Sequence, residues 1–116
     1  MKKWTISIPL RLPKANDYIR YHWSKQQRTR NEWRRLLDLF GGNIPPAAKP
    51  RKVRVISYRK QLLDRDDALY LTADKVILDS LVRLELLVDD KSEWCKLEVK
   101  QVKMNWDEFT VVEISE

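Results

Sequence analysis

Two pairs of aspartates are the side chains whose types and spacing best suit catalysis. Asp64 and Asp66 are separated by one residue, and in an extended backbone such side chains point to the same side. Asp89 and Asp90 follow at a turn that we expect to fold back towards them. Mg²⁺ takes oxygen ligands and keeps several waters, so two or three carboxylates suffice to hold it. The spacing predicts a Mg²⁺ site that activates water for phosphodiester hydrolysis, with Lys75 stabilising the developing charge.

Other catalytic chemistries have little support in this sequence. His22 is the only histidine, and it stands among basic residues, where a DNA contact or a structural role is expected. Cys95 is the only cysteine, which excludes an internal disulfide and a cysteine-based zinc site. The only two glycines are adjacent, so no glycine-rich loop can cradle phosphates and no nucleotide cofactor is expected.

The aspartates also have a purely structural interpretation. An Asp-x-Asp sequence at the start of a helix commonly caps the helix and interacts with its dipole. Two aspartates in a turn are equally ordinary. From the residues alone, both interpretations stay open.

The distribution of charge indicates a polyanionic partner. Residues 1–60 contain 16 Lys and Arg against three acids, whereas residues 61–116 contain seven against 14. A basic half favours nucleic acid, because neutralised phosphates release counterions whatever the sequence. A solvated surface of mixed charge is the alternative. No run of apolar residues approaches the length of a membrane span or of a signal-peptide core, so we expect a cytoplasmic protein without a membrane partner.

The elements that must position these residues can be predicted from periodicity. Alternation predicts strands over 4–8, 52–58, 94–102 and 109–114, and helical spacing predicts helices from Ser24 to the glycines and over 68–84. Residues 11–21 are predicted to form a loop. We therefore expect one α+β domain over residues 1–116, with a small mixed sheet and two main helices. Apolar residues in excess on the second helix, Leu71, Leu78 and Val82, are candidates for a subunit interface.

Three motifs in order resemble the RusA-type Holliday junction resolvases. They are the Asp64-Arg65-Asp66-Asp67 sequence, the helix from Lys75 to Leu81 with its K-x-x-x-D-x-L pattern, and the apolar stretch that ends in Asp89-Asp90. The strand ending at Ile8-Pro9, followed by Pro13 and Asn16, is also similar to the opening of these proteins.

The resemblance implies a homodimeric endonuclease that binds four-way DNA junctions and makes paired nicks with Mg²⁺ or Mn²⁺. Asp64, Asp66 and Asp90 would be the catalytic metal ligands, and Lys75 the catalytic lysine. Proteins of this family are often encoded by phages or prophages. The basic half would then meet the DNA arms, through the predicted contacts Asn16, Arg20, His22, Lys25, Arg28 and Arg30.

The sequence departs from the family pattern at three positions. Asp67 replaces the usual asparagine, so the metal pair could be Asp66 and Asp67. Lys75 is nine residues after Asp66, which is a wider spacing than in shorter family members. Glu85 replaces a glycine that often precedes the acidic turn, so that the loop there is expected to differ.

Overall fold

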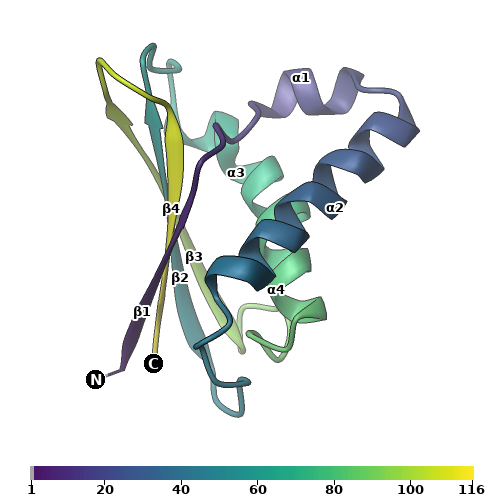
Figure 1. Cartoon of the computed structure of the whole chain (residues 1–116), viewed down its shortest axis with the longest axis vertical. Coiled ribbons are helices and arrows are strands. Elements are labelled where there is room, and N and C mark those ends of the chain that lie inside the picture. The colour runs from purple at the N-terminus through teal and green to yellow at the C-terminus, as the bar shows by residue number, and fades with distance from the viewer. Residues whose placement is uncertain (1) are drawn as a thin grey trace.

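A computed structural model describes residues 2–116 as an α+β domain in which helices cover one face of a four-stranded sheet (Figure 1). In chain order the elements are β1 (Lys3–Ile8), α1 (Ala15–Arg20), α2 (Trp23–Phe40), β2 (Arg51–Arg59), a 3₁₀ turn (Asp66–Leu69), α3 (Tyr70–Thr72), a π-helical turn (Ala73–Leu78), α4 (Asp79–Arg83), β3 (Cys95–Lys103) and β4 (Phe109–Ser115). No helix among residues 2–116 is long and apolar enough to cross a membrane.

The sheet is mixed, as predicted, and its strand order is β1-β4-β2-β3. β4 pairs antiparallel with both β1 and β2, whereas β2 and β3 are parallel. In the parallel pair Arg51 lies opposite Cys95, and Arg59 lies opposite Lys103. The loop that leaves β2 and the loop that leads into β3 therefore lie at opposite ends of the sheet.

Alternation along β2 explains why the helices lie on one face of the sheet. The odd-numbered residues from Arg51 to Arg59 are buried, and the even-numbered residues between them are half-buried. The apolar members of the buried set, Val53 and Val55, pack into the core beneath the helices. Two arginines nevertheless occupy the first and last buried positions of the strand, and both are 3% exposed.

The second helical segment is less regular than the single helix predicted over residues 68–84. It runs as a 3₁₀ turn, a short α-helix, a π-helical turn and a final α-helix. The wider π turn buries the consecutive residues Val76, Ile77 and Leu78 together. Leu78 is 3% exposed, so it is a core residue and cannot be part of a surface interface as predicted. Leu71 and Val82 remain half-buried.

The loop predicted over residues 11–21 is wrong in part, because α1 forms within it. The helix begins after Lys14, whose extended backbone (φ −70°, ψ 152°) follows Pro13. Tyr18 is the residue through which α1 enters the core. The asparagine and aspartate that indicated a loop lie in the first turn of the helix, where polar side chains are well tolerated.

The cap of α2 also differs from the prediction, which placed Ser24 there. His22 is the capping residue, and its Nδ1 accepts a hydrogen bond from the backbone N–H of Ser24 at 3.2 Å. Its ring also lies 5.5 Å from that of Trp23. His22 therefore has the structural role that was one of its two expected roles.

Candidate nucleic-acid interface and metal centre

The structure does not bring Asp64 and Asp90 together. Asp64 lines a cavity beside Arg59, at the end of β2, whereas the charge of Asp90 acts on Cys95, at the start of β3. Since β2 and β3 are parallel over nine residues, these two ends are separated by roughly 26 Å at ~3.3 Å per residue. The expected folding back of the acidic turn towards Asp64 is therefore not observed. The assignment of these aspartates to one metal stays a prediction.

The backbone around Asp64 and Asp66 has the extended form that their spacing requires. Arg65, between them, has φ −142° and ψ 144°. No side chain caps the helical segment that begins here, but Asp66 and Asp67 lie in its first turn, where acids interact favourably with the helix dipole, so the structural interpretation of these aspartates holds in part. Asp67 has a partner of its own, because its carboxylate accepts hydrogen bonds from Arg65 Nε at 3.0 Å and from Nη2. Among the acids of this segment, Asp67 is thus already paired with a cation.

The acidic turn (residues 88–91) is held by its own side chain. Asp89 Oδ1 accepts hydrogen bonds from the backbone N–H groups of Asp90 at 2.7 Å and Lys91 at 3.3 Å. A hydrogen bond to Asp89, partial burial and the charge of Asp74 together raise the pKa of Asp90. Three carboxylates thus influence one another at this end of the sheet.

Asp74 is the acidic residue that the sequence did not single out. It lies in the π-helical turn, next to Lys75, and its charge reaches both Asp90 and Cys95. Burial, followed by the charges of Asp90 and Asp74, raises the pKa of the Cys95 thiol to about 11. The position of Asp74 directly before the family-like lysine is the one signal in the sequence that could have indicated it. π turns inside helices are frequent at functional sites.

These carboxylates are suited to a hard cation, although they do not form a complete cage. Among residues 2–116, no three histidine, cysteine or carboxylate side chains lie close enough to hold a metal ion by themselves. Mg²⁺ is commonly held by one or two carboxylates and several waters, so it does not need three. The hydrogen bond with Asp89 and desolvation are the main causes of the raised pKa of Asp90, and the repulsion from Asp74 that adds to them is the kind that a bound cation relieves. Asp74 and Asp90 supply the carboxylate oxygens that such a site would use.

A basic groove lies on the other side of Lys75, between α2 and the second helical segment. It encloses about 330 Å³. Its charged lining is formed by Arg30, Arg34, Lys75, Asp79 and Arg83. Asp79 Oδ2 lies 3.5 Å from Arg83 Nε, which leaves an excess of three positive charges in the groove. Arg34 Nε is buried without a hydrogen-bond partner. The groove therefore suits the phosphates of a nucleic acid.

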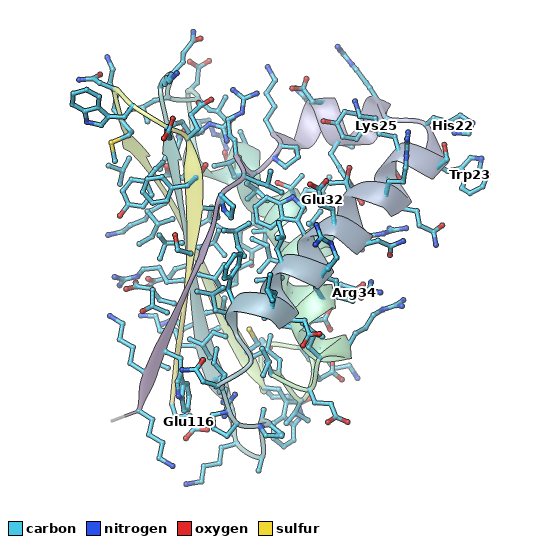
Figure 2. The ribbon with its side chains drawn as sticks, in the orientation of Figure 1. His22, Trp23, Lys25, Glu32, Arg34 and Glu116 are labelled. Atoms are coloured by element: carbon cyan, nitrogen blue, oxygen red, sulfur yellow. The ribbon has the colours of Figure 1, made fainter. Side chains whose placement is uncertain are left out.

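The remaining predicted DNA contacts are spread over α1 and the first half of α2. Figure 2 shows His22 and Trp23 at the corner between these helices, projecting away from the sheet. Lys25 Nζ lies 4.0 Å from the centre of the Tyr21 ring, in a cation–π contact. The other exposed members are Asn16, Arg20 and Arg28. Arg30 is the one predicted contact that lines the basic groove, whereas Arg34 and Arg83 join it as residues less expected from sequence.

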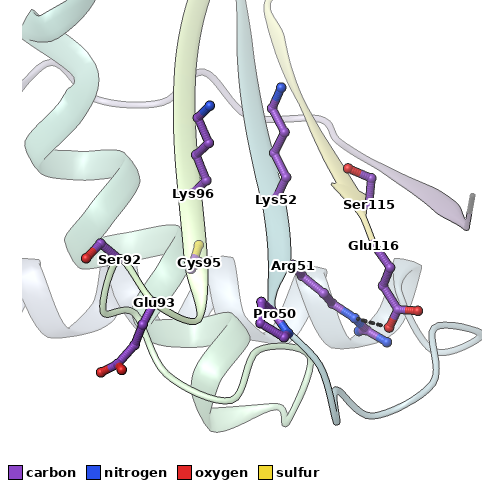
Figure 3. Close-up of a pocket in the computed structure, with 9 residues that line it drawn as sticks. All are labelled: Pro50, Arg51, Lys52, Ser92, Glu93, Cys95, Lys96, Ser115 and Glu116. Atoms are coloured by element: carbon purple, nitrogen blue, oxygen red, sulfur yellow. Dashed lines mark hydrogen bonds and ion pairs between the residues drawn. The ribbon is translucent and has the colours of Figure 1, made fainter.

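At the start of β2, Arg51 lines a third hollow and is held there by several partners (Figure 3). Arg51 Nε donates to Glu116 Oε2 at 3.0 Å. Its Nη1 donates to the carbonyls of Pro45 and Leu86, at 3.0 and 3.1 Å. The guanidinium also lies 4.6 Å from the centre of the Trp4 ring. Arg51 thus links the first strand, through Trp4, and the C-terminal Glu116 to the loop that follows α4, through Leu86.

No known family has a sequence pattern that matches this chain, and no curated protein matches it significantly. The functional inference therefore depends on the residues, their geometry and the resemblance of the three motifs.

Proposed function

We propose that this protein is a Mg²⁺-dependent endodeoxyribonuclease that acts on branched DNA, and that four-way junctions are its substrate. The observation that carries the proposal is the placement of two successive residues in the π-helical turn. Asp74 interacts electrostatically with Asp90, while Lys75 lines the basic groove. Carboxylates for a cation and cations for phosphate thus lie on adjacent residues, and hydrolysis of a phosphodiester needs both.

The order of motifs supports the same function. A D-x-D segment, a lysine-containing helix and an acidic turn follow one another as they do in the RusA-type resolvases. Glu85 adds to this support. Its φ of 65° is left-handed, a conformation that glycine adopts most easily, and the family often has glycine there. The loop therefore keeps the backbone conformation that a glycine would provide, although the residue differs.

In this mechanism the groove binds and orients the DNA strand. Arg30, Arg34 and Arg83 bind its phosphates, and Lys75 neutralises charge that develops at the reacting phosphate. Asp74 and Asp90 would hold Mg²⁺ at the Arg51 end of the sheet, whereas the motifs predict Asp64 and Asp66 as the ligands, which would place the ion at the Arg59 end instead. When bound, Mg²⁺ lowers the pKa of a coordinated water and so supplies the nucleophile, and Mn²⁺ can substitute for it.

A homodimer is part of the proposal, because paired nicks need two active sites. One site cannot reach two symmetric strands at once, whereas an isologous pair matches the twofold symmetry of a junction. The face of the sheet opposite the helices carries half-buried apolar residues, including Tyr58 and Phe109, whose rings stack at 4.4 Å. Sedimentation should report about twice the mass of the 13.9 kDa chain.

A DNA-binding module without catalytic activity is the second candidate. It is favoured by the distance between Asp64 and Asp90, and by the lack of three convergent ligands within residues 2–116. The basic groove serves this function as well as it serves a nuclease. The two candidates differ in one respect, which is whether phosphodiester bonds are cut.

Labelled four-way junction, replication fork and linear duplex should each be incubated with Mg²⁺, Mn²⁺ or EDTA. We expect paired nicks in the junction with either metal and none in EDTA. Binding without cleavage in every metal would support the module. Cleavage of the fork in preference to the junction would keep the nuclease and change its substrate.

A further inference from the structure

Arg59 is a buried cation that lacks an anionic partner. It is 3% exposed, and its Nη1 donates to neutral oxygens, the carbonyl of Leu12 at 2.7 Å and Ser57 Oγ at 3.1 Å. Its Nε is buried without a hydrogen bond, and no carboxylate of residues 2–116 lies within ion-pair distance of it. A buried charge is costly unless it is paired, so this guanidinium needs an anion that the described chain does not provide.

The guanidinium of Arg59 lines a polar cavity of about 340 Å³. Arg11 and Lys14 line the same cavity, and the charge of Arg11 lies close enough to lower the pKa of Arg59 further, after the larger effect of burial. Asp17 and Asp64 are the acidic residues of the lining. Three cations against two carboxylates leave a net positive cavity, in which two arginines repel each other.

We propose that this cavity, the arginine cavity, is a binding site for a phosphate group of a nucleic-acid strand. A phosphate accepts several hydrogen bonds at once and carries the charge that Arg59 lacks, and arginine recognises it through two parallel N–H groups. The site rests on the proposed action on DNA, and it would hold a second point of the strand at the end of β2. The basic groove would hold the first.

Glu108, the acid that forms an ion pair with this cluster, does so weakly. Glu108 Oε2 lies 3.6 Å from Arg11 Nη1, beyond a good hydrogen bond, and accepts instead from the backbone N–H of Lys60 at 3.0 Å. Arg11 therefore remains able to turn towards a ligand. The charges of Glu108 and Asp17 offset part of the repulsion between Arg11 and Arg59, but neither lies within ion-pair distance of Arg59, and a phosphate bound between the two guanidinium groups would bond to both.

The test follows the Nε–Hε resonance of Arg59 by NMR in EDTA, so that no cleavage intervenes. The probes are inorganic phosphate, thymidine 5′-monophosphate and a thymidine dinucleotide with one phosphodiester and no terminal phosphate. We expect inorganic phosphate to shift this resonance with a dissociation constant on the order of 1 mM. A shift with the monophosphate assigns the site to a strand end, and a shift with the dinucleotide assigns it to the backbone.

Two variants and a control make the result specific. Arg59→Lys keeps the charge but loses the planar fork, and its binding is followed through the backbone amide resonances of the cavity residues instead. The pair Arg11→Ser and Lys14→Ser, one exposed and one half-buried position outside the core, removes two cations. Each should weaken phosphate binding about tenfold or more, because charge-assisted hydrogen bonds are lost. The control pair Lys2→Ser and Lys49→Ser makes the same change of charge at exposed positions away from the cavity. It should bind phosphate as the unmodified protein does.

The proposal is overturned if no probe shifts Arg59 at tens of millimolar, or if the control pair weakens binding as much as the cavity pair. The proposed phosphate site and the proposed nuclease activity can fail independently. Phosphate binding by a protein that leaves junctions uncut keeps the cavity and removes the nuclease. Normal cutting without phosphate binding does the reverse.

Discussion

Arg51 and Arg59 occupy equivalent positions at the two ends of β2, but their surroundings differ. Both are 3% exposed and both face the helices. Arg51 is bonded to a carboxylate, two carbonyls and an aromatic ring, whereas Arg59 has two neutral partners and an unpaired Nε. The charge of Arg51 is paired within the fold, whereas the charge of Arg59 is not. A buried arginine marks a binding site when its partners fail to neutralise it.

The predicted carboxylates also lie at the two ends of the sheet, Asp90 at the Arg51 end and Asp64 at the Arg59 end. Substitutions can therefore show which end is catalytic. We expect Asp90→Asn to reduce junction cleavage at least 100-fold, as loss of a metal ligand does, while junction binding is kept or tightened because repulsion of phosphate is removed. Asp74→Asn should match it, since the charge of Asp74 reaches Asp90. Cleavage rates and binding are measured on the same labelled junction.

Asp64→Asn and Asp66→Asn then test the motif-based assignment. Full loss of cleavage in both, with Asp74→Asn unaffected, would place the metal at the Arg59 end, as the sequence predicts. Loss in Asp67→Asn with Asp64→Asn unaffected would favour the other metal pair. Normal cleavage by Asp90→Asn would remove the acidic turn from the active site altogether.

The difference between the arginines predicts unequal losses of stability. Arg51→Met leaves the Glu116 carboxylate and the carbonyls of Pro45 and Leu86 without their donor, and should lower the free energy of unfolding by about 3 kcal/mol. Arg59→Met removes an unpaired buried charge along with two hydrogen bonds, so it should cost under about 1 kcal/mol. Urea unfolding followed by tryptophan fluorescence compares the two variants. Equal losses would mean that Arg59 is as well satisfied as Arg51.

The Arg51 end can be stabilised further at Glu85. This residue has φ 65° and follows the C-cap of α4, and the N–H groups of Glu85 and Leu86 donate to the carbonyls of Val82 and Leu81 at 3.0 and 2.8 Å. This is the pattern of a helix end at which glycine is preferred. Glu85→Gly should therefore raise the free energy of unfolding by about 1 kcal/mol, by relieving left-handed strain. Glu85→Ala is the control, which should give no such gain.

The sequence predicted most of the fold from local patterns. Alternation located all four strands, and apolar spacing located α2 to within about a residue at its start and end. Local patterns could not reveal α1, because its polar first turn resembles a loop, or the π-helical turn, because an extra residue in one turn leaves no periodic signal. The register between strands is a long-range property, so the parallel pairing that separates Asp64 from Asp90 could not be predicted from spacing along the chain.

The sequence predicted which residues form the candidate site better than it predicted how they are placed in space. Lys75 and Arg30 were named from the sequence, and the structure places both in one groove. Arg59 was counted as one positive charge among 16 in the basic half, since nothing in a strand sequence shows whether a buried arginine has a partner. Asp74 lies outside the motifs, so the sequence gives little indication that its charge acts on Asp90.

The smallest expected effect is on the pKa of the Cys95 thiol, which responds to the charges of Asp74 and Asp90 and can be measured in the absence of DNA. Burial, then the charges of Asp90 and Asp74, holds its pKa at about 11. Because the thiol pKa is higher in the folded protein than in the unfolded chain, the folded state favours the neutral thiol. The free energy of unfolding is therefore unaffected by this thiol below its unfolded pKa, and it falls as the pH rises from that value towards about 11. Asp90→Asn and Asp74→Asn should each lower this pKa, measured from the pH dependence of alkylation by iodoacetamide. Asp64→Asn changes a carboxylate at the other end of the sheet, so it should leave the pH dependence of alkylation unchanged. If it shifted the thiol pKa as much as Asp90→Asn does, the two ends of the sheet could not be separated as the parallel strands require.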